Sequence, residues 1–215
     1  MQVSRTSVGA VATAIGLAVT SASGANAAIL LDDFSADQTV ADAAIGPIPT
    51  TNTVGNRTFT VDNRAAVAPF DASLTSGGVS DTLKFSNQTG VNGIATIDYV
   101  LGGADLSSGA RFLLDMLSFD LADKMAEVTV AVNGVASSRS VGDEDVGTLA
   151  FGFGSFAGVD FSNVTTLSIT LDALDAPSLD ASFDDFRVAA VPAPAAGLLM
   201  IGGLGALGLF RRRRA

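Results

Sequence analysis

Cysteine, histidine and tryptophan are absent from the 215 residues, and tyrosine occurs once, as Tyr99. Without cysteine no disulfide can staple the chain, so its stability has to come from a hydrophobic core. Without histidine, a Ser-His-Asp triad, a Cys-His pair and the usual zinc sites are excluded. The lack of tryptophan leaves few aromatic rings to stack on sugars, so any glycan contact would rest on polar loops and Tyr99.

Basic residues are scarce in the central part of the chain. All 22 acidic residues lie between Asp32 and Asp185, while five of the 12 basic residues stand outside residues 28–190. The central stretch therefore has seven basic residues and a net charge of −15. No basic face can form there to neutralise phosphates, so we expect no nucleic-acid partner. The balance suits divalent cations, or solubility alone.

The first 27 residues fit a secretory signal peptide. Arg5 supplies the charged start, and Val8–Thr20 supplies the apolar stretch. The small residues Ala25 and Ala27 form the cleavage site, which places the cut before Ala28. The alternative is an uncleaved N-terminal membrane anchor, although the apolar run is short for one.

The C-terminal end has three parts in a fixed order. A short motif comes first, made of Val191, Pro192, Ala193, Pro194 and Ala195. The sixteen apolar residues from Ala195 to Phe210 come next, which span about 24 Å as a helix and can cross a bilayer that thins locally. The chain then ends on a basic cluster that stops transfer and stays cytoplasmic, formed by Arg211, Arg212, Arg213 and Arg214. This order predicts an exported body and a cytoplasmic tail.

The C-terminal order of parts resembles the PEP-CTERM family of sorting signals. Ala193 stands where that family commonly has glutamate, so the motif is more similar to the Val-Pro-x-Pro-Ala variety. The resemblance implies an exosortase-type membrane peptidase as partner, removal of the tail, and release or attachment at the cell surface. It also implies that the protein is produced together with an exopolysaccharide. The alternative is an ordinary tail anchor.

Residues 28–190 show strand patterns and no long helical period. In the clearest one, Val128, Val130 and Val132 alternate with polar or small residues, and Asn133-Gly134 follows as a type I′ hairpin turn. The 111–121 stretch is apolar on both parities, which predicts a strand buried on both faces or two strands meeting at a bulge. The expected strands are Ile29–Phe34, Arg57–Val61, Thr82–Phe85, Ile94–Leu101, Arg111–Leu121, 127–132, Val135–Val141, Thr148–Phe153, Val164–Leu171 and Ser182–Ala189.

These strands predict an all-β domain, an antiparallel β-sandwich of the jelly-roll kind, with a concanavalin-like sandwich as the alternative. Three segments resemble galactose-binding-like and carbohydrate-binding jelly rolls: Asp32-Asp33-Phe34, Ser118-Phe119-Asp120-Leu121 and Phe183-Asp184-Asp185-Phe186. The resemblance implies adjacent first and last strands and a structural calcium ion held by Asp32, Asp33, Asp184 and Asp185. Because neighbouring strand residues point to opposite faces, one of each pair at most could share a cage. The alternative is outward-facing Asp residues beside buried Phe residues.

Two loops look like sites but fail on closer reading. Three carboxylates crowd into Gly142–Gly147, which lacks the Asp-x-Asp-x-Asp-Gly run of a calcium loop and is expected to be a solvated turn. Ser155 is not the serine of a nucleophile elbow, because Phe153 and Ala157 stand at the two positions where that motif requires glycine.

The sequence thus favours a non-enzymatic exported surface or matrix protein that associates with glycan. A secreted polysaccharide hydrolase is one alternative, but no pair of carboxylates is singled out for catalysis. A solute-binding or sensory ectodomain is the other.

Overall fold

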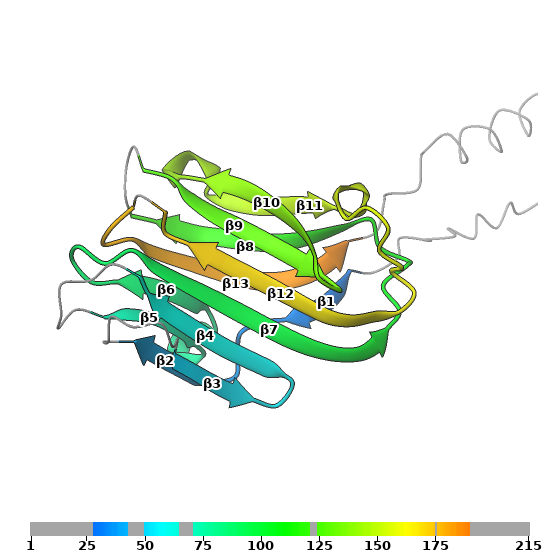
Figure 1. The fold of residues 1–215 in the computed structure, drawn as a ribbon, viewed down its shortest axis with the longest axis horizontal. Coiled ribbons are helices and arrows are strands. Elements are labelled where there is room, and N and C mark those ends of the chain that lie inside the picture. Colours follow the sequence, from blue (N-terminus) through cyan, green and yellow to red (C-terminus); the bar gives the residue numbers. More distant parts are fainter. Residues whose placement is uncertain (1–27, 43–49, 65–70, 121–123, 175, 190–215) are drawn as a thin grey trace, which may run out of the picture.

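The computed structural model describes residues 28–42, 50–64, 71–120, 124–174 and 176–189. These residues form two antiparallel β-sheets stacked face to face, with the hydrophobic core between them (Figure 1). The structure therefore confirms the prediction of an all-β sandwich. No helix among the described residues is long and apolar enough to cross a membrane. The expected signal peptide and sorting helix lie outside these residues.

The first sheet, called sheet A, has seven strands. In spatial order they are β11 (Gly147–Gly152), β8 (Arg111–Phe119), β13 (Asp180–Ala189), β6 (Leu83–Asn87), β5 (Ala72–Ser76) and β2 (Gln38–Asp42), with β1 (Ile29–Asp32) paired to β13. The second sheet, called sheet B, runs β10 (Val135–Val141), β9 (Ala126–Val132), β12 (Val164–Asp172), β7 (Gly93–Ala104), β4 (Arg57–Asn63) and β3 (Thr50–Val54). Three short 3₁₀ turns connect strands: Gly78–Ser80, Asp143–Asp145 and Phe153–Ser155.

The last eight strands are connected as in a jelly roll. Strand β6 lies beside β13, β7 beside β12, β8 beside β11 and β9 beside β10. This is the pairing of one long hairpin whose two arms are folded over together, so that its pairs lie alternately in sheets A and B. Strands β2 and β5 widen sheet A, and β3 and β4 widen sheet B. Strand β1 pairs with β13, which places the first and last strands side by side as expected.

Alternation along each strand sends one set of side chains into the core. In β9 the three valines face inward and are buried, while Glu127, Thr129 and Ala131 face outward. Much of the core is phenylalanine, and six of these side chains are almost completely buried: Phe34, Phe59, Phe85, Phe112, Phe183 and Phe186. Those rings hold the sheets together and are not available for stacking on a ligand.

The predicted hairpin at Asn133-Gly134 is confirmed. Val132 pairs with Val135 across a two-residue turn, and both turn residues have positive φ, 47° for Asn133 and 82° for Gly134. These are the values that a type I′ turn requires.

Bulges account for two patterns that simple alternation misreads. In β8 the register slips by one residue at Leu117, so this side chain is exposed while Met116 and Phe119 are both buried. Over Arg111–Phe119 the chain is thus one strand with a bulge, and not a strand buried on both faces. In β13 a second bulge includes Asp185, at φ 43°, and lets Phe183 and Phe186 both face the core.

Three strands are absent from the sequence-based prediction. Strands β2, β3 and β5 have five residues each, and more than half of the residues in each are polar, so they lack a strong apolar alternation. Strand β3 could have been found from the Gly55-Asn56 dipeptide, because Gly-Asn between two alternating runs is a hairpin signal. Gly55 has φ 65°, as the first residue of a type II′ turn requires.

Candidate functional site

The outer face of sheet B presents a continuous row of hydroxyl groups. One residue from each of the six strands stands in register across the sheet, and the row reads Ser138, Thr129, Thr170, Thr96, Thr60 and Thr51. Neighbouring strands lie about 4.8 Å apart, so the row is roughly 24 Å long. Two hydrogen bonds join neighbouring hydroxyl groups within the row, one between Thr129 and Ser138 at 2.7 Å and one between Thr96 and Thr170 at 3.3 Å. Each hydroxyl keeps capacity for a further partner.

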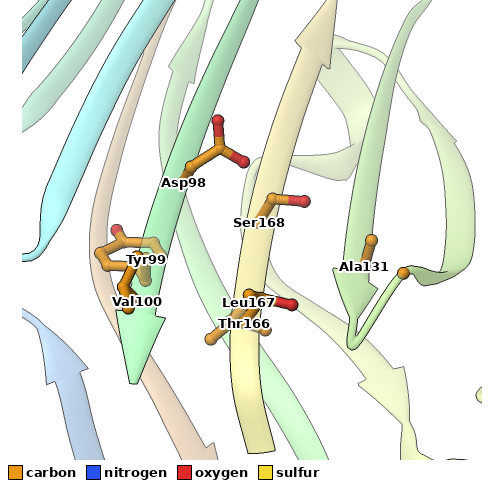
Figure 2. Close-up of a pocket in the computed structure, with 8 residues that line it drawn as sticks. Asp98, Tyr99, Val100, Ala131, Thr166, Leu167 and Ser168 are labelled. Atoms are coloured by element: carbon orange, nitrogen blue, oxygen red, sulfur yellow. The ribbon is translucent and has the colours of Figure 1, made fainter. Parts of the chain in front are cut away.

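A shallow hollow lies next to this row, over the middle of sheet B. It has a volume of about 420 Å³ and is lined by Asp98, Tyr99, Val100, Ala131, Gly134, Thr166, Leu167 and Ser168. Ala131, Ser168 and Asp98 stand in register on β9, β12 and β7, as Figure 2 shows. The hollow exists because Ala131, Gly134 and Ser168 are too small to fill the space between the β9–β10 turn and β7.

Asp98 is the charged group of this hollow. Its register partners are Thr58 on β4 and Ser168 on β12, and neither they nor any other described residue gives it a hydrogen bond or an ion pair. Although Asp98 is an exposed residue, partial burial against the sheet raises the pKa of its carboxyl group, and no donor offsets this. Its carboxylate oxygens are therefore free to accept hydrogen bonds from a ligand.

The six strands of sheet B offer no unpaired cation. Their two basic residues are Arg57 and Arg139. Arg57 is buried on the inner face, and Arg139, on the edge strand β10, pairs with Asp145 at 2.7 Å. Chemically, the face can exchange hydrogen bonds with hydroxyl groups and can bind a cation, but it has no group that would pair with an anion.

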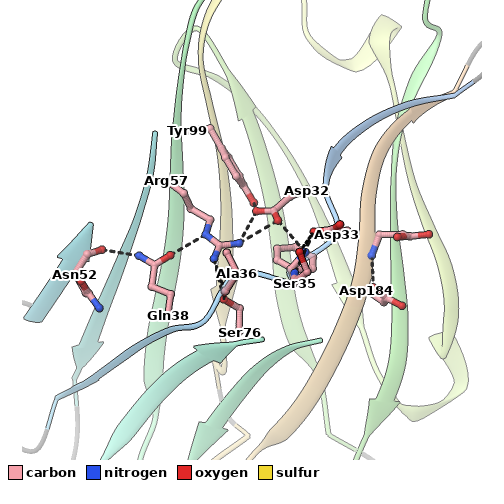
Figure 3. Close-up of polar contacts among 12 residues, drawn as sticks. Asp32, Asp33, Ser35, Ala36, Gln38, Asn52, Arg57, Ser76, Tyr99 and Asp184 are labelled. Atoms are coloured by element: carbon pink, nitrogen blue, oxygen red, sulfur yellow. Dashed lines mark hydrogen bonds and ion pairs between the residues drawn. The ribbon is translucent and has the colours of Figure 1, made fainter. Parts of the chain in front are cut away.

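Asp32 belongs to a different site from the one expected. Both of its carboxylate oxygens bond Nη1 of Arg57, at 3.0 and 2.8 Å, and the Tyr99 hydroxyl donates to Oδ2 at 2.9 Å (Figure 3). The backbone N–H of Phe34 donates to Oδ1 at 2.8 Å. The group ties β1 of sheet A to β4 and β7 of sheet B, so Asp32 has a structural partner and is not turned toward a metal ion.

Every donor of the Arg57 guanidinium has a partner. Beyond its two bonds to Asp32, Nε donates to Gln38 at 2.7 Å, and Nη2 donates to the Ala36 carbonyl and the Ser76 hydroxyl, each at 2.9 Å. The guanidinium also lies 4.8 Å from the centre of the Phe59 ring. A buried cation is tolerated when its charge is paired and its donors are satisfied, and both conditions hold here.

Tyr99 is not a sugar-stacking residue. Its ring is 4% exposed and lies 6.2 Å from the ring of Phe186, in the core. Burial, and then the charge of Asp32, raises the pKa of the Tyr99 hydroxyl well above its usual value of 10, so the group stays protonated as a donor. The expectation that Tyr99 would contact glycan is therefore wrong for its ring, which is buried in the core, although the residue is among those that line the hollow.

The four carboxylates expected to hold calcium do not converge. Asp33 accepts hydrogen bonds from the backbone and hydroxyl of Ser35, and Asp184 accepts one from the backbone of Asp185. Among the described residues, no group of three or more carboxylates could hold a metal ion. With Asp32 taken by Arg57, the expected four-residue cage does not fit, and calcium binding stays a prediction.

Asp33 and Asp185 nevertheless lie close enough to Asp184 for their charges to act on it. Burial, together with the charges of Asp185, Asp115 and Asp33, raises the pKa of Asp184. The bulge in β13 leaves Asp184 and Asp185 both partly exposed, so the expectation that adjacent strand residues point to opposite faces fails at this pair. The guanidinium of Arg187 lies near these carboxylates and forms ion pairs with Asp115 at 2.6 Å and with Asp185 at 3.6 Å.

The acidic loop after β10 is a turn with two solvent-exposed carboxylates, which agrees with the expected solvated turn. Asp145 accepts a hydrogen bond from the backbone of Gly142 at 3.0 Å and pairs with Arg139, while Asp143 and Glu144 are exposed.

Most of the expected sorting and cleavage residues lie outside the described residues. These are Ala25, Ala27, Val191, Pro192, Ala193, Pro194, Ala195, Arg211, Arg212, Arg213 and Arg214; Ala28 is described and exposed. Asp98, in contrast, was missed by the sequence reading. Its signal is weak, a charge in the outward position of the alternating strand 94–101.

Comparisons with known proteins find only remote similarities to solved structures. No family model and no curated protein matches it. The chain is similar to a family 11 carbohydrate-binding module of a cellulosomal cellulase of Clostridium thermocellum, at 18% identity and a TM-score of 0.46, over 77% of this chain and 95% of that one. It is also similar to an exo-beta-agarase, at 14% identity and a TM-score of 0.40, over 77% of this chain and 25% of that one.

A third similar structure is a family 29 carbohydrate-binding module complexed with mannohexaose, at 11% identity and a TM-score of 0.35, over 71% of this chain and 92% of that one. At such TM-scores the likeness is remote. The function therefore has to be inferred from this chain's own side chains.

Proposed function

We propose that this chain is a non-enzymatic, exported surface or matrix protein that associates with extracellular polysaccharide through the outer face of sheet B. The observation that supports it is the pairing of a hydroxyl row across six strands with a hollow that contains one unpartnered carboxylate, Asp98. The hollow has the size of a small-ligand site. Its small apolar residues, Ala131 and Val100, would contact the C–H groups of a sugar, while Asp98 and Ser168 would bond its hydroxyls.

A chain of sugars suits this face better than a single small molecule. The row is roughly 24 Å long and contains one hydroxyl-bearing residue from every strand of sheet B. A polymer that lies across the strands therefore meets a new hydrogen-bonding partner at each strand. Each such bond is weak by itself, because exposed groups exchange water for sugar with little net gain. Affinity would come from several repeats bound at once.

The same face does not favour hydrolysis. Cleavage of a glycosidic bond ordinarily needs two carboxyl groups flanking it, one of them in the role of acid. Asp98 is the one carboxylate among the residues that line the hollow. We therefore propose binding without turnover.

The two ends of the chain support the proposed location. A signal peptide cut before Ala28 would export the body. The Val191–Ala195 motif, the apolar stretch and the four arginines would hold the chain in the inner membrane until an exosortase-type peptidase removes the tail. The body would then remain at the cell surface or in the matrix, where polysaccharide is present.

Affinity electrophoresis against a polysaccharide panel tests the binding proposal. The full-length protein in mild detergent should be retarded by at least one glycan, without release of reducing sugar. Asp98→Ala should weaken that retardation about tenfold, because a hydrogen bond to a charged group contributes about 1.5–3 kcal/mol.

Asp143→Ala is the matched control for Asp98→Ala. It removes one exposed carboxylate from the loop after β10, away from the hollow, and should leave retardation unchanged. Failure of every glycan in the panel to retard the protein would contradict the proposal, and so would equal retardation of wild type and Asp98→Ala.

A further inference from the structure

We infer that the polysaccharide bound by sheet B carries free amino groups, as a partly deacetylated amino-sugar polymer does. This inference rests on the proposed function and names its ligand class. It is drawn from charge complementarity between the ligand and the face that surrounds Asp98.

The groups around Asp98 are all uncharged. Its register partners are Thr58 and Ser168, and its nearest outward neighbours along β7 are Thr96 and Val100. No cation from β4 or β12 faces it, so the carboxylate has lost part of its hydration without gaining a counter-charge. That arrangement is unfavourable in the free protein and would be relieved by a ligand that brings a positive charge.

An ammonium group matches this site in its donors as well as in its charge. It carries three N–H donors and no acceptor. Asp98 can accept from one or two of them, and the hydroxyl of Ser168, beside Asp98 on β12, can accept another. Charge-assisted hydrogen bonds of this kind are about twice as strong as neutral ones, so an amine gains more here than a hydroxyl does.

An acidic polysaccharide is disfavoured by the same face. The outward charges of the six strands are Asp62, Asp98, Glu127 and Asp172. Asp172 is already paired, with Arg64, but that pair adds no net positive charge. A uronate chain would bring carboxylates against carboxylates with no cation to bind, so its binding would be opposed by repulsion.

Two oligosaccharides that differ only in acetylation test the inference. We would compare a glucosamine hexamer with an N-acetylglucosamine hexamer by calorimetry, using the full-length protein in mild detergent, with a hexauronate as the acidic arm. The amine form should bind at least tenfold more tightly than the acetylated form, and the hexauronate should not bind. Asp98→Asn keeps the shape of the side chain and should abolish the preference for the amine.

General attraction between an acidic protein and a cationic sugar has to be separated from this site. Asp143→Asn removes the same charge elsewhere and should keep the preference. The inference would be overturned if both Asp98→Asn and Asp143→Asn lost the preference for the amine hexamer, or if both kept it. Equal binding of the two hexamers, or binding of some other neutral glycan alone, would also overturn it while the proposed function stands. Binding of no glycan would remove both.

The pH dependence gives an independent readout. The amine stays protonated in acid, so Asp98 is the group at this site that titrates. The preference for the amine hexamer should be present between the pKa of Asp98 and the pKa of the sugar amine, and it should disappear as the pH falls through the pKa of Asp98. Because that pKa is raised, the loss should begin at a higher pH than an ordinary Asp would show. A preference that persists at a pH where Asp98 is protonated would contradict its role.

Discussion

At the scale of single residues, the buried Arg57 is the centre of the polar cluster between the two sheets. Its five N–H donors bond to Asp32, Gln38, Ala36 and Ser76. Replacing Arg57 by Met keeps an apolar stem of similar length but leaves the Asp32 carboxylate buried without its cation. We expect Arg57→Met to lower the free energy of unfolding by about 3–5 kcal/mol, measured by urea denaturation.

The double variant Asp32→Leu, Arg57→Met is the matched control for that loss. Removing both charges together leaves no uncompensated ion, so the double variant should be more stable than Arg57→Met. A double variant as unstable as the sum of its two single variants would show that the pair does not act as a unit.

At the scale of elements, the β9–β10 hairpin depends on its turn residue for more than turn geometry. The Asn133 side chain accepts hydrogen bonds from the backbone of Thr165 and Thr166 and the hydroxyl of Thr165, and it donates to the Asn163 carbonyl. Asn133→Gly keeps the positive φ that the turn needs but loses these bonds. We expect it to lower the free energy of unfolding by about 1–2 kcal/mol in a urea titration.

Gly134→Ala separates the turn from the anchor. A Cβ at Gly134 would meet nothing within 4 Å, so its cost is limited to an unfavourable positive φ of 82°. We expect a loss of about 1 kcal/mol. If Asn133→Gly proved as stable as wild type, the contacts of Asn133 with the start of β12 would be shown to contribute nothing.

At the scale of the whole molecule, the chain's two ends predict its mature form. The protein recovered from the surface of producing cells should begin at Ala28 and end near Pro192–Pro194. Intact-mass spectrometry would measure this directly. A surface form that still carries Arg211–Arg214 would contradict the sorting proposal. Replacing the four arginines with Ser should let the tail slip through the membrane, because the positive charges that retain it would be gone.

Local pattern was enough to predict much of the fold. The alternation of Val128, Val130 and Val132 predicted β9, and Asn133-Gly134 predicted the hairpin, because both signals act over a few neighbouring residues. Ten strands were expected where the described residues have thirteen. The three that were missed are short and polar, and they form because neighbouring strands in the sheets supply their hydrogen-bond partners.

The candidate site was much less predictable. Asp32 and Asp33 are adjacent in sequence, yet one is bonded to Arg57 and the other to Ser35. The partner of Asp33 is two residues away, whereas the side-chain partners of Asp32 are on strands that begin 25 residues or more further along the chain. Alternation failed at Asp184 and Asp185 for another reason, since a bulge shifted the register there.

The sequence alone therefore predicts an exported, acidic, disulfide-free chain of antiparallel strands, because charge, missing residue types and short-range periodicity are properties of the chain itself. Only the tertiary structure shows that six strands bring one Ser or Thr each into a single row. It alone shows that Asp98 has no partner while Asp32 has three. Register between strands far apart in sequence produces both results, and register is set by how the whole core packs.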